Sequence, residues 1–106
     1  MQELKPTTTI KSTKNNLLNG TKWRCTSELE EGIEYHEIRF VSPNKVEGWS
    51  KDRAKNQAEQ MFIANYVLTG ETLRIEQDHK NFQAVLVHKK IIAFVDDKTM
   101  VFHPAV

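Results

Sequence analysis

The sequence contains a single cysteine, Cys25, in 106 residues. One cysteine cannot form an internal disulfide, and it leaves no cysteine framework for a structural zinc ion. Stability must therefore come from the burial of apolar side chains, unlike that of small secreted proteins held by several disulfides. A chain of this length has room for one hydrophobic core, so we expect one domain.

An excess of charge of one sign is also missing. The chain has 15 lysines and arginines against 14 aspartates and glutamates, which gives a net charge of +1. Proteins that are attracted to nucleic acids or to acidic membranes usually carry a clear positive excess. The balance therefore favours neither kind of partner.

Long hydrophobic runs are absent. The longest, residues 91–95, is far shorter than the roughly 18 apolar residues needed to cross a bilayer. The first 16 residues are polar and lack the apolar centre of a signal peptide, so they predict a flexible tail before a domain at 17–106. The sequence as printed favours a cytoplasmic location; the alternative is an exported protein from which a signal peptide has been removed.

From Leu17 onward, short runs of alternating apolar and polar residues are separated by turn residues. The runs begin roughly every 8–15 residues, which is typical of all-β sandwiches and barrels, and no helical repeat lies regularly between them. The pattern predicts an all-β fold, an up-and-down antiparallel meander of about eight short strands. Residues 51–59 are ambiguous, because the spacing of Ala54, Ala58 and Met61 fits a short helix as well as a polar loop.

The first and last strands carry no inward lysine or mid-strand proline that would protect an open edge. Pairing the strand at Trp23 with the strand at 100–103 removes both edges, so we expect a closed barrel. Because the predicted interior residues include many large side chains on short strands, we expect a mostly filled centre. The predicted interior consists of Trp23, Cys25, Leu29, Ile38, Phe40, Phe62, Ala64, Leu73, Ile75, Phe82, Ala84, Leu86, Ile92, Phe94, Met100 and Phe102.

Four segments, LLNGTKWRC, HEIRFVSPNKVEGW, NYVLTGETLRI and TMVFHP, resemble in this order the small lipocalin-like (calycin) domains of bacteria, including the META-type barrels. Leu18, Gly20, Thr21 and Trp23 match their opening pattern. The resemblance implies a barrel in which Trp23 plugs one end. It does not imply a single function, because such barrels include ligand carriers, protease inhibitors and domains without a known role.

Two inward polar side chains are candidate ligand-binding residues. Alternation places His36 on one face with Ile38 and Phe40, and Tyr66 on the inward face of a later strand. A few polar groups in an apolar lining are typical of small-molecule sites, and a histidine would make ligand affinity sensitive to pH near 6.5. In a filled barrel, the two side chains would instead bond to each other or to backbone, as structural residues of the core.

The remaining motifs favour structural roles. Cys25 is expected to be a small buried residue, and Asp96-Asp97 is typical of a turn rather than a calcium loop. The other histidines do not share a metal-binding spacing, and no glycine-rich phosphate loop or nucleophile elbow occurs, so we expect no metal and no cofactor.

Lys51, Arg53 and Lys55, together with residues 89–90, could line a nucleic-acid surface. Such a surface needs aromatic rings among its charges, and only Tyr35 and Trp49 are expected to face outward. A solvated surface is the better interpretation.

We therefore expect a non-catalytic binding domain for a small apolar ligand or a protein partner, and no binding of nucleic acid. The alternatives are a small enzyme that uses His36 and Tyr66 in the barrel mouth, and a single-strand nucleic-acid binder.

Overall fold

The computed structural model describes residues 17–27, 29–78 and 80–105. The predicted tail at 1–16 lies outside the described residues, as does His79. The described residues form eight strands: β1 (Lys22–Cys25), β2 (Ile33–Phe40), β3 (Lys45–Asp52), β4 (Glu59–Thr69), β5 (Thr72–Gln77), β6 (Lys80–Val87), β7 (Lys90–Val95) and β8 (Lys98–Ala105). Within this part of the chain, no helix is long and apolar enough to cross a membrane.

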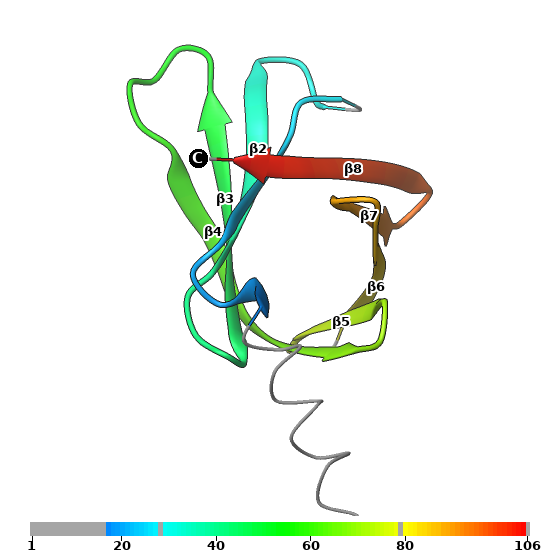
Figure 1. Ribbon diagram of the computed structural model, residues 1–106. Helices are drawn as coiled ribbons and strands as arrows, with labels where there is room; N and C mark the ends of the chain where they lie inside the picture. The colour runs from blue at the N-terminus through cyan, green and yellow to red at the C-terminus, as the bar shows by residue number, and fades with distance from the viewer. Residues whose placement is uncertain (1–16, 28, 79, 106) are drawn as a thin grey trace, which may run out of the picture.

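Each strand pairs antiparallel with the next along the chain, and β8 pairs with β1 (Figure 1). In the closing pair, Trp23 lies opposite Pro104 and Arg24 lies opposite His103. Closure gives the backbone groups of both terminal strands hydrogen-bonding partners, which an open meander would leave exposed. The predicted all-β meander and its closure into a barrel are confirmed.

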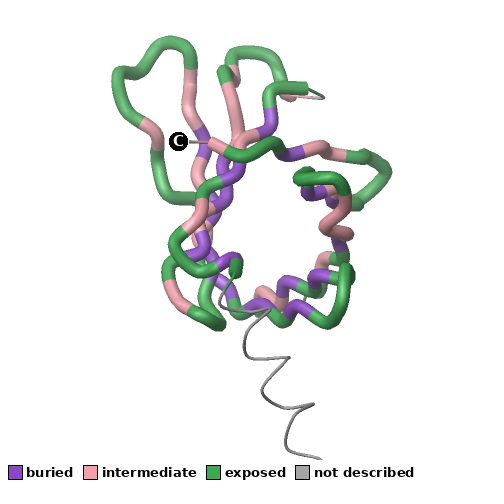
Figure 2. The backbone as a smooth tube through the Cα atoms, in the orientation of Figure 1, coloured by how far each residue is buried: buried purple, intermediate pink, exposed green. Residues whose placement is uncertain are grey.

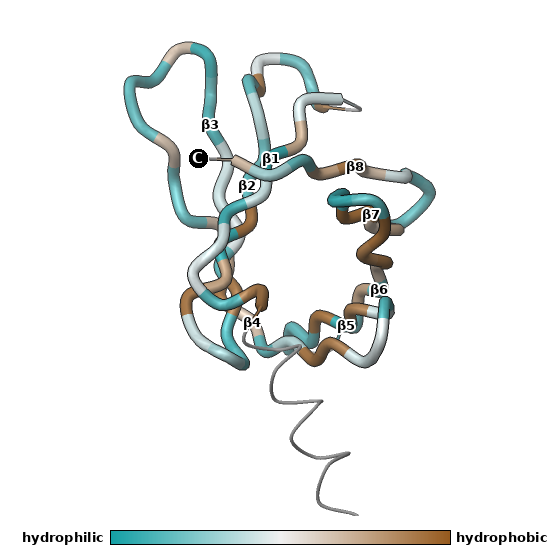
Figure 3. The backbone as a smooth tube through the Cα atoms, in the orientation of Figure 1, coloured by the Kyte–Doolittle hydropathy of each residue, from teal (hydrophilic) through white to brown (hydrophobic). Residues whose placement is uncertain are grey.

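The core lies inside the barrel and follows the two-residue period of the strands. Exposed and buried residues alternate over residues 72–75 of β5 in Figure 2, and polar and apolar residues alternate with them in Figure 3. Most of the predicted interior is buried or packs against the core, and Leu18, Val46, Tyr66 and Leu68 join it.

The predicted interior face of β7 is wrong. The sequence pattern predicts Ile92 and Phe94 inside, but Ile91 and Ala93 are buried, whereas Phe94 is 51% exposed. Every residue from 91 to 95 is apolar, so alternation cannot indicate which face is buried. The register is set instead by the two-residue turn at 88–89, where both residues have positive φ.

The region of residues 51–59 contains no helix; the loop alternative is the correct one. β3 continues to Asp52, whose side chain accepts a hydrogen bond from the Ala54 N–H at 2.8 Å. The ammonium group of Lys51 donates to the carbonyl oxygens of Asp52 and Lys55. These bonds satisfy the Ala54 N–H and the Asp52 and Lys55 carbonyls without a helix.

One end of the barrel is filled by the residues that precede β1. Gly20 has a φ of +86°, which favours glycine, and its N–H donates to the Phe40 carbonyl at 2.6 Å. The Thr21 hydroxyl donates to the Leu18 carbonyl and accepts a bond from the Trp23 indole N–H at 2.9 Å. Trp23 is buried in the core, which confirms its predicted place in the interior.

Candidate functional site

The other end of the barrel gathers the loops β1–β2, β3–β4, β5–β6 and β7–β8. Consecutive strands of a meander run in opposite directions, so alternate loops meet at the same end. The loops β2–β3, β4–β5 and β6–β7 lie at the plugged end with Trp23.

A cavity of about 540 Å³ lies within the half of the barrel below these loops. The prediction of a mostly filled centre is therefore wrong for this half. The apolar wall of the cavity is formed by Ile38, Phe62, Ile75, Phe82, Ala84, Ile91, Ala93, Val95, Met100 and Phe102.

Small residues account for this space. Ala84 of β6 pairs with Ala93 of β7, so two methyl groups stand where larger side chains would meet near the axis. Gly48 of β3 pairs with Phe62 of β4, and a Cβ at Gly48 would clash with the Phe62 ring. The ring thus lies against the β3 backbone, because glycine leaves room for it there.

The rim of the cavity is polar. Glu30, in the β1–β2 loop, lies 3.1 Å from His36 Nε2 and 3.6 Å from Lys98 Nζ. A backbone hydrogen bond and the bond to His36 lower the pKa of Glu30, so its carboxylate is ionised at neutral pH. An ionised carboxylate only accepts hydrogen bonds, and His36 Nε2 must therefore carry the donated proton. Asp96 and Asp97, in the β7–β8 turn, complete the acidic part of the rim.

The two predicted site residues lie at opposite ends of the barrel. His36 lines the cavity at its rim. Tyr66 lies in the filled half, where its ring packs edge-on against Phe40 at 4.8 Å and its hydroxyl donates to the Ser42 carbonyl at 2.9 Å. Burial raises the pKa of Tyr66 to about 12. The structure therefore does not bring the two side chains together, and only His36 contacts the cavity.

Sequence reasoning missed the contribution of Glu30, Asp96, Asp97 and Lys98 to the rim. Each lies in a loop or at a strand end, where charged residues are common and indicate little by themselves. The predicted meander contained the missing signal, because an up-and-down topology places the β1–β2 and β7–β8 loops at one end. Combining loop position with topology would have grouped these residues.

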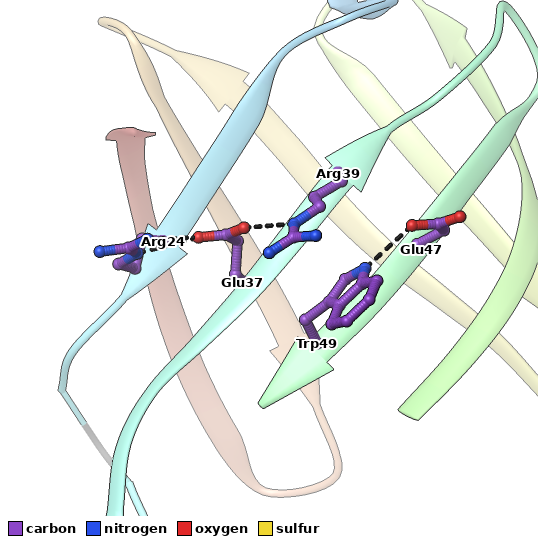
Figure 4. Close-up of polar contacts among 5 residues, drawn as sticks. All are labelled: Arg24, Glu37, Arg39, Glu47 and Trp49. Carbon is purple, nitrogen blue, oxygen red and sulfur yellow. Dashed lines mark hydrogen bonds and ion pairs between the residues drawn. The ribbon is translucent and has the colours of Figure 1, made fainter. Parts of the chain in front are cut away.

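A second polar cluster lies on the outer face of β1–β3 (Figure 4). Glu37 points outward, yet its side chain is only 1% exposed, because Arg24 and Arg39 bond to its two oxygens from either side. Burial opposes ionisation of Glu37, but the hydrogen bonds and charges of Arg39 and Arg24 outweigh it, so the pKa of Glu37 is lowered. Glu37 and the two arginines form a satisfied charge network.

The same arginines cover the two outward aromatic rings. Arg24 stacks on Tyr35 at 3.9 Å, and Arg39 stacks on Trp49 at 4.0 Å. The indole N–H of Trp49 donates to Glu47 at 2.9 Å (Figure 4). Both rings are thus held in cation–π contacts whose cations are already paired with Glu37. The cluster connects β1, β2 and β3 on the outer face of the barrel.

Cys25 is fully buried, and its thiol donates to the Ser27 carbonyl at 3.2 Å. It does not line the cavity.

Within the described residues, no group of three or more histidine, cysteine, aspartate or glutamate side chains could hold a metal ion.

Comparison of the chain with protein-family models, with curated proteins and with solved structures finds no match. The cavity and its rim are therefore the basis for a function.

Proposed function

We propose that this protein is a non-catalytic, lipocalin-like binding domain that takes a small, largely apolar ligand into the cavity at the open end of its barrel. The observation that carries the proposal is the cavity of about 540 Å³. Small-molecule sites typically have volumes of roughly 300–1,000 Å³, a mainly apolar lining and a few polar groups that orient the ligand. The apolar wall residues, which include Ile38 and Phe102, supply the lining, and the rim at His36 supplies the polar groups.

The architecture supports the same function. A barrel of eight strands is just wide enough to be filled by side chains or to hold one small ligand. Here the half around Trp23 is filled by side chains, whereas the half around Ala84 and Ala93 holds the cavity. The filled half supports the fold, so the hollow half can retain space without loss of the barrel. A ligand would enter between the loops that carry Glu30 and Asp96.

The direct test is a titration with N-phenyl-1-naphthylamine, an uncharged apolar dye whose fluorescence rises in an apolar environment. We expect saturable binding of one dye per protein. The variant Ala93→Leu places a larger side chain in the cavity and should weaken dye binding by about tenfold or more. Ala54→Leu makes the same substitution in the β3–β4 loop, outside the cavity wall, and should leave dye binding unchanged.

Thermal unfolding of each variant shows whether it is folded, and Ala84→Leu is the replacement if Ala93→Leu does not fold. The absence of saturable dye binding by the wild-type protein would overturn the proposal. Equal dye binding by wild type and by a folded Ala93→Leu or Ala84→Leu variant would overturn it as well, because the dye would then bind outside the cavity.

A further inference from the structure

The charges on the cavity rim are unequal. At the rim, the carboxylates of Glu30, Asp96 and Asp97 border the cavity together with one lysine, Lys98, and the fourth acidic lining residue, Glu37, lies on the wall. Glu30 is the partner of both Lys98 and His36. Within the part of the chain that the structure describes, no cationic side chain forms an ion pair with Asp96 or Asp97. Among the described residues, the rim therefore has two adjacent carboxylates without a cationic partner.

Among the residues that the structure describes, the wall below the rim offers no compensating cation. Apart from Glu37 and the uncharged Gln77 and Gln83, its side chains are apolar. Glu37 also borders the cavity, but its carboxylate is bound by Arg24 and Arg39 on the outer face of the sheet (Figure 4). A ligand carboxylate buried among these side chains would lose its hydration without gaining a counter-ion. At the rim, it would meet the negative charges of Asp96 and Asp97.

The β7–β8 turn holds these two carboxylates next to the apolar wall. Val95 lines the wall and pairs with Lys98, so that only Asp96 and Asp97 lie between the two strands. Asp96 has a φ of +55°, which aspartate tolerates in a tight turn. The acidic pair is thus fixed at the end of the cavity, one residue beyond its apolar lining.

We propose that the cavity selects an apolar ligand that carries one protonated amine, with the apolar body against the wall and the ammonium group at Asp96 and Asp97. This inference rests on the proposed function, because it concerns the ligand class of the same cavity. An ammonium group would remain partly hydrated at the exposed rim and would be attracted by both carboxylates. Fatty acids and other apolar anions would be disfavoured.

This selectivity is tested with three probes that share a naphthalene ring and differ in their polar group: 1-naphthylmethylamine, 1-naphthalenemethanol and 1-naphthoate. Their affinities are measured by displacement of N-phenyl-1-naphthylamine at neutral pH. We expect the amine to bind about tenfold more tightly than the alcohol, and the carboxylate to bind more weakly than the alcohol. The differences should shrink at about 1 M sodium chloride, where charges are screened beyond roughly 3 Å.

The double variant Asp96→Asn and Asp97→Asn removes the unpaired charges, and asparagine tolerates the positive φ at position 96. It should bind the amine and the alcohol alike, with an unchanged affinity for the alcohol. The matched control is Asp78→Asn, in a turn at the same end of the barrel, because Asp78 also has a positive φ but does not line the cavity. This control should keep the preference for the amine.

The outcomes separate this inference from the proposed function. Binding of the alcohol without a preference for the amine, or a preference that survives in the folded double variant, would overturn the amine assignment and leave the apolar cavity in place. Failure of the dye and of all three probes to bind would overturn the proposed function itself.

Discussion

Ala84 of β6 lies directly opposite Ala93 of β7, and both methyl groups face the cavity. At the other end of the barrel, Ala64 of β4 lies opposite Val46 of β3, and both are buried in the filled core. The same residue type thus occupies two environments. The first leaves space beside the alanine, and the second does not.

This difference predicts opposite effects of the same substitution. Ala93→Leu should raise the free energy of unfolding by about 1 kcal/mol, because its added carbons are buried in existing space. Ala64→Leu should lower it by about 1–3 kcal/mol, because the extra volume strains a packed region. Urea denaturation of both variants measures the two changes. Equal losses of stability would show that the barrel is filled throughout.

Trp23 should be the largest single contributor to the plugged end. Trp23→Ala empties a large buried site and should cost about 3–5 kcal/mol of unfolding free energy. Trp49→Ala is the matched control, since Trp49 lies half-buried on the outer face and its loss should cost less. An unfolding temperature for Trp23→Ala within a degree of the wild type would contradict the role of Trp23 in the core.

The sequence contained enough information for the barrel, because strands such as residues 72–77 alternate cleanly between apolar and polar residues. The sequence pattern predicts the wrong inward face for β7, because the apolar run is unbroken and the turn at 88–89 decides the register. The cavity could not be predicted either. Its volume depends on Ala84 lying opposite Ala93, a pairing between strands that no pattern within one strand reveals.

His36 was within reach of sequence reasoning because strand alternation places it inward, beside Ile38. The separation of His36 from Tyr66 was not. Alternation indicates the face on which a side chain lies but not its depth along the barrel axis. Depth depends on the lengths and registers of all the intervening strands, and these bring the Tyr66 hydroxyl to the Ser42 carbonyl in the β2–β3 loop, at the plugged end.

Glu37 should make the stability of the barrel sensitive to acid. Its pKa in the folded protein lies below the ordinary value of 4.5, because the bonds and charges of Arg39 and Arg24 outweigh the cost of burial. A carboxyl group with a lowered pKa contributes stability above pH 4.5, and this contribution is lost as the pH falls through the folded-state pKa.

The variant Glu37→Gln should therefore lose about 1–3 kcal/mol at neutral pH, and its difference from the wild type should shrink below about pH 4. Unfolding in urea across this pH range measures both. Glu76→Gln removes an exposed partner of Arg74 and should change stability little at any pH. A difference between Glu37→Gln and wild type that stays constant from neutral to acid pH would show that the carboxylate charge of Glu37 does not stabilise the fold.

Tyr66 should cause a loss of unfolding free energy at alkaline pH. Its folded-state pKa of about 12 exceeds the ordinary value of 10, because burial disfavours the phenolate. A raised pKa means that the stabilisation is complete below pH 10 and is lost as the pH rises toward 12. Tyr66→Phe should remove this alkaline loss, and the missing bond to the Ser42 carbonyl should cost about 1 kcal/mol at neutral pH. Unfolding at neutral pH and above pH 10 distinguishes the two effects; a similar alkaline loss in both proteins would exclude Tyr66 as its source.

The positions of His36 and Tyr66 predict different effects on ligand binding. His36 lines the cavity, whereas Tyr66 bonds to backbone in the filled half. His36→Leu removes the donor to Glu30 and places an apolar side chain at the rim, so it should change the affinity for 1-naphthylmethylamine severalfold. Tyr66→Phe should leave that affinity unchanged, even though it lowers stability. Dye displacement with both single variants separates the roles, and melting curves confirm that each is folded. A loss of affinity in folded Tyr66→Phe, with none in His36→Leu, would move the binding site away from the open end of the barrel.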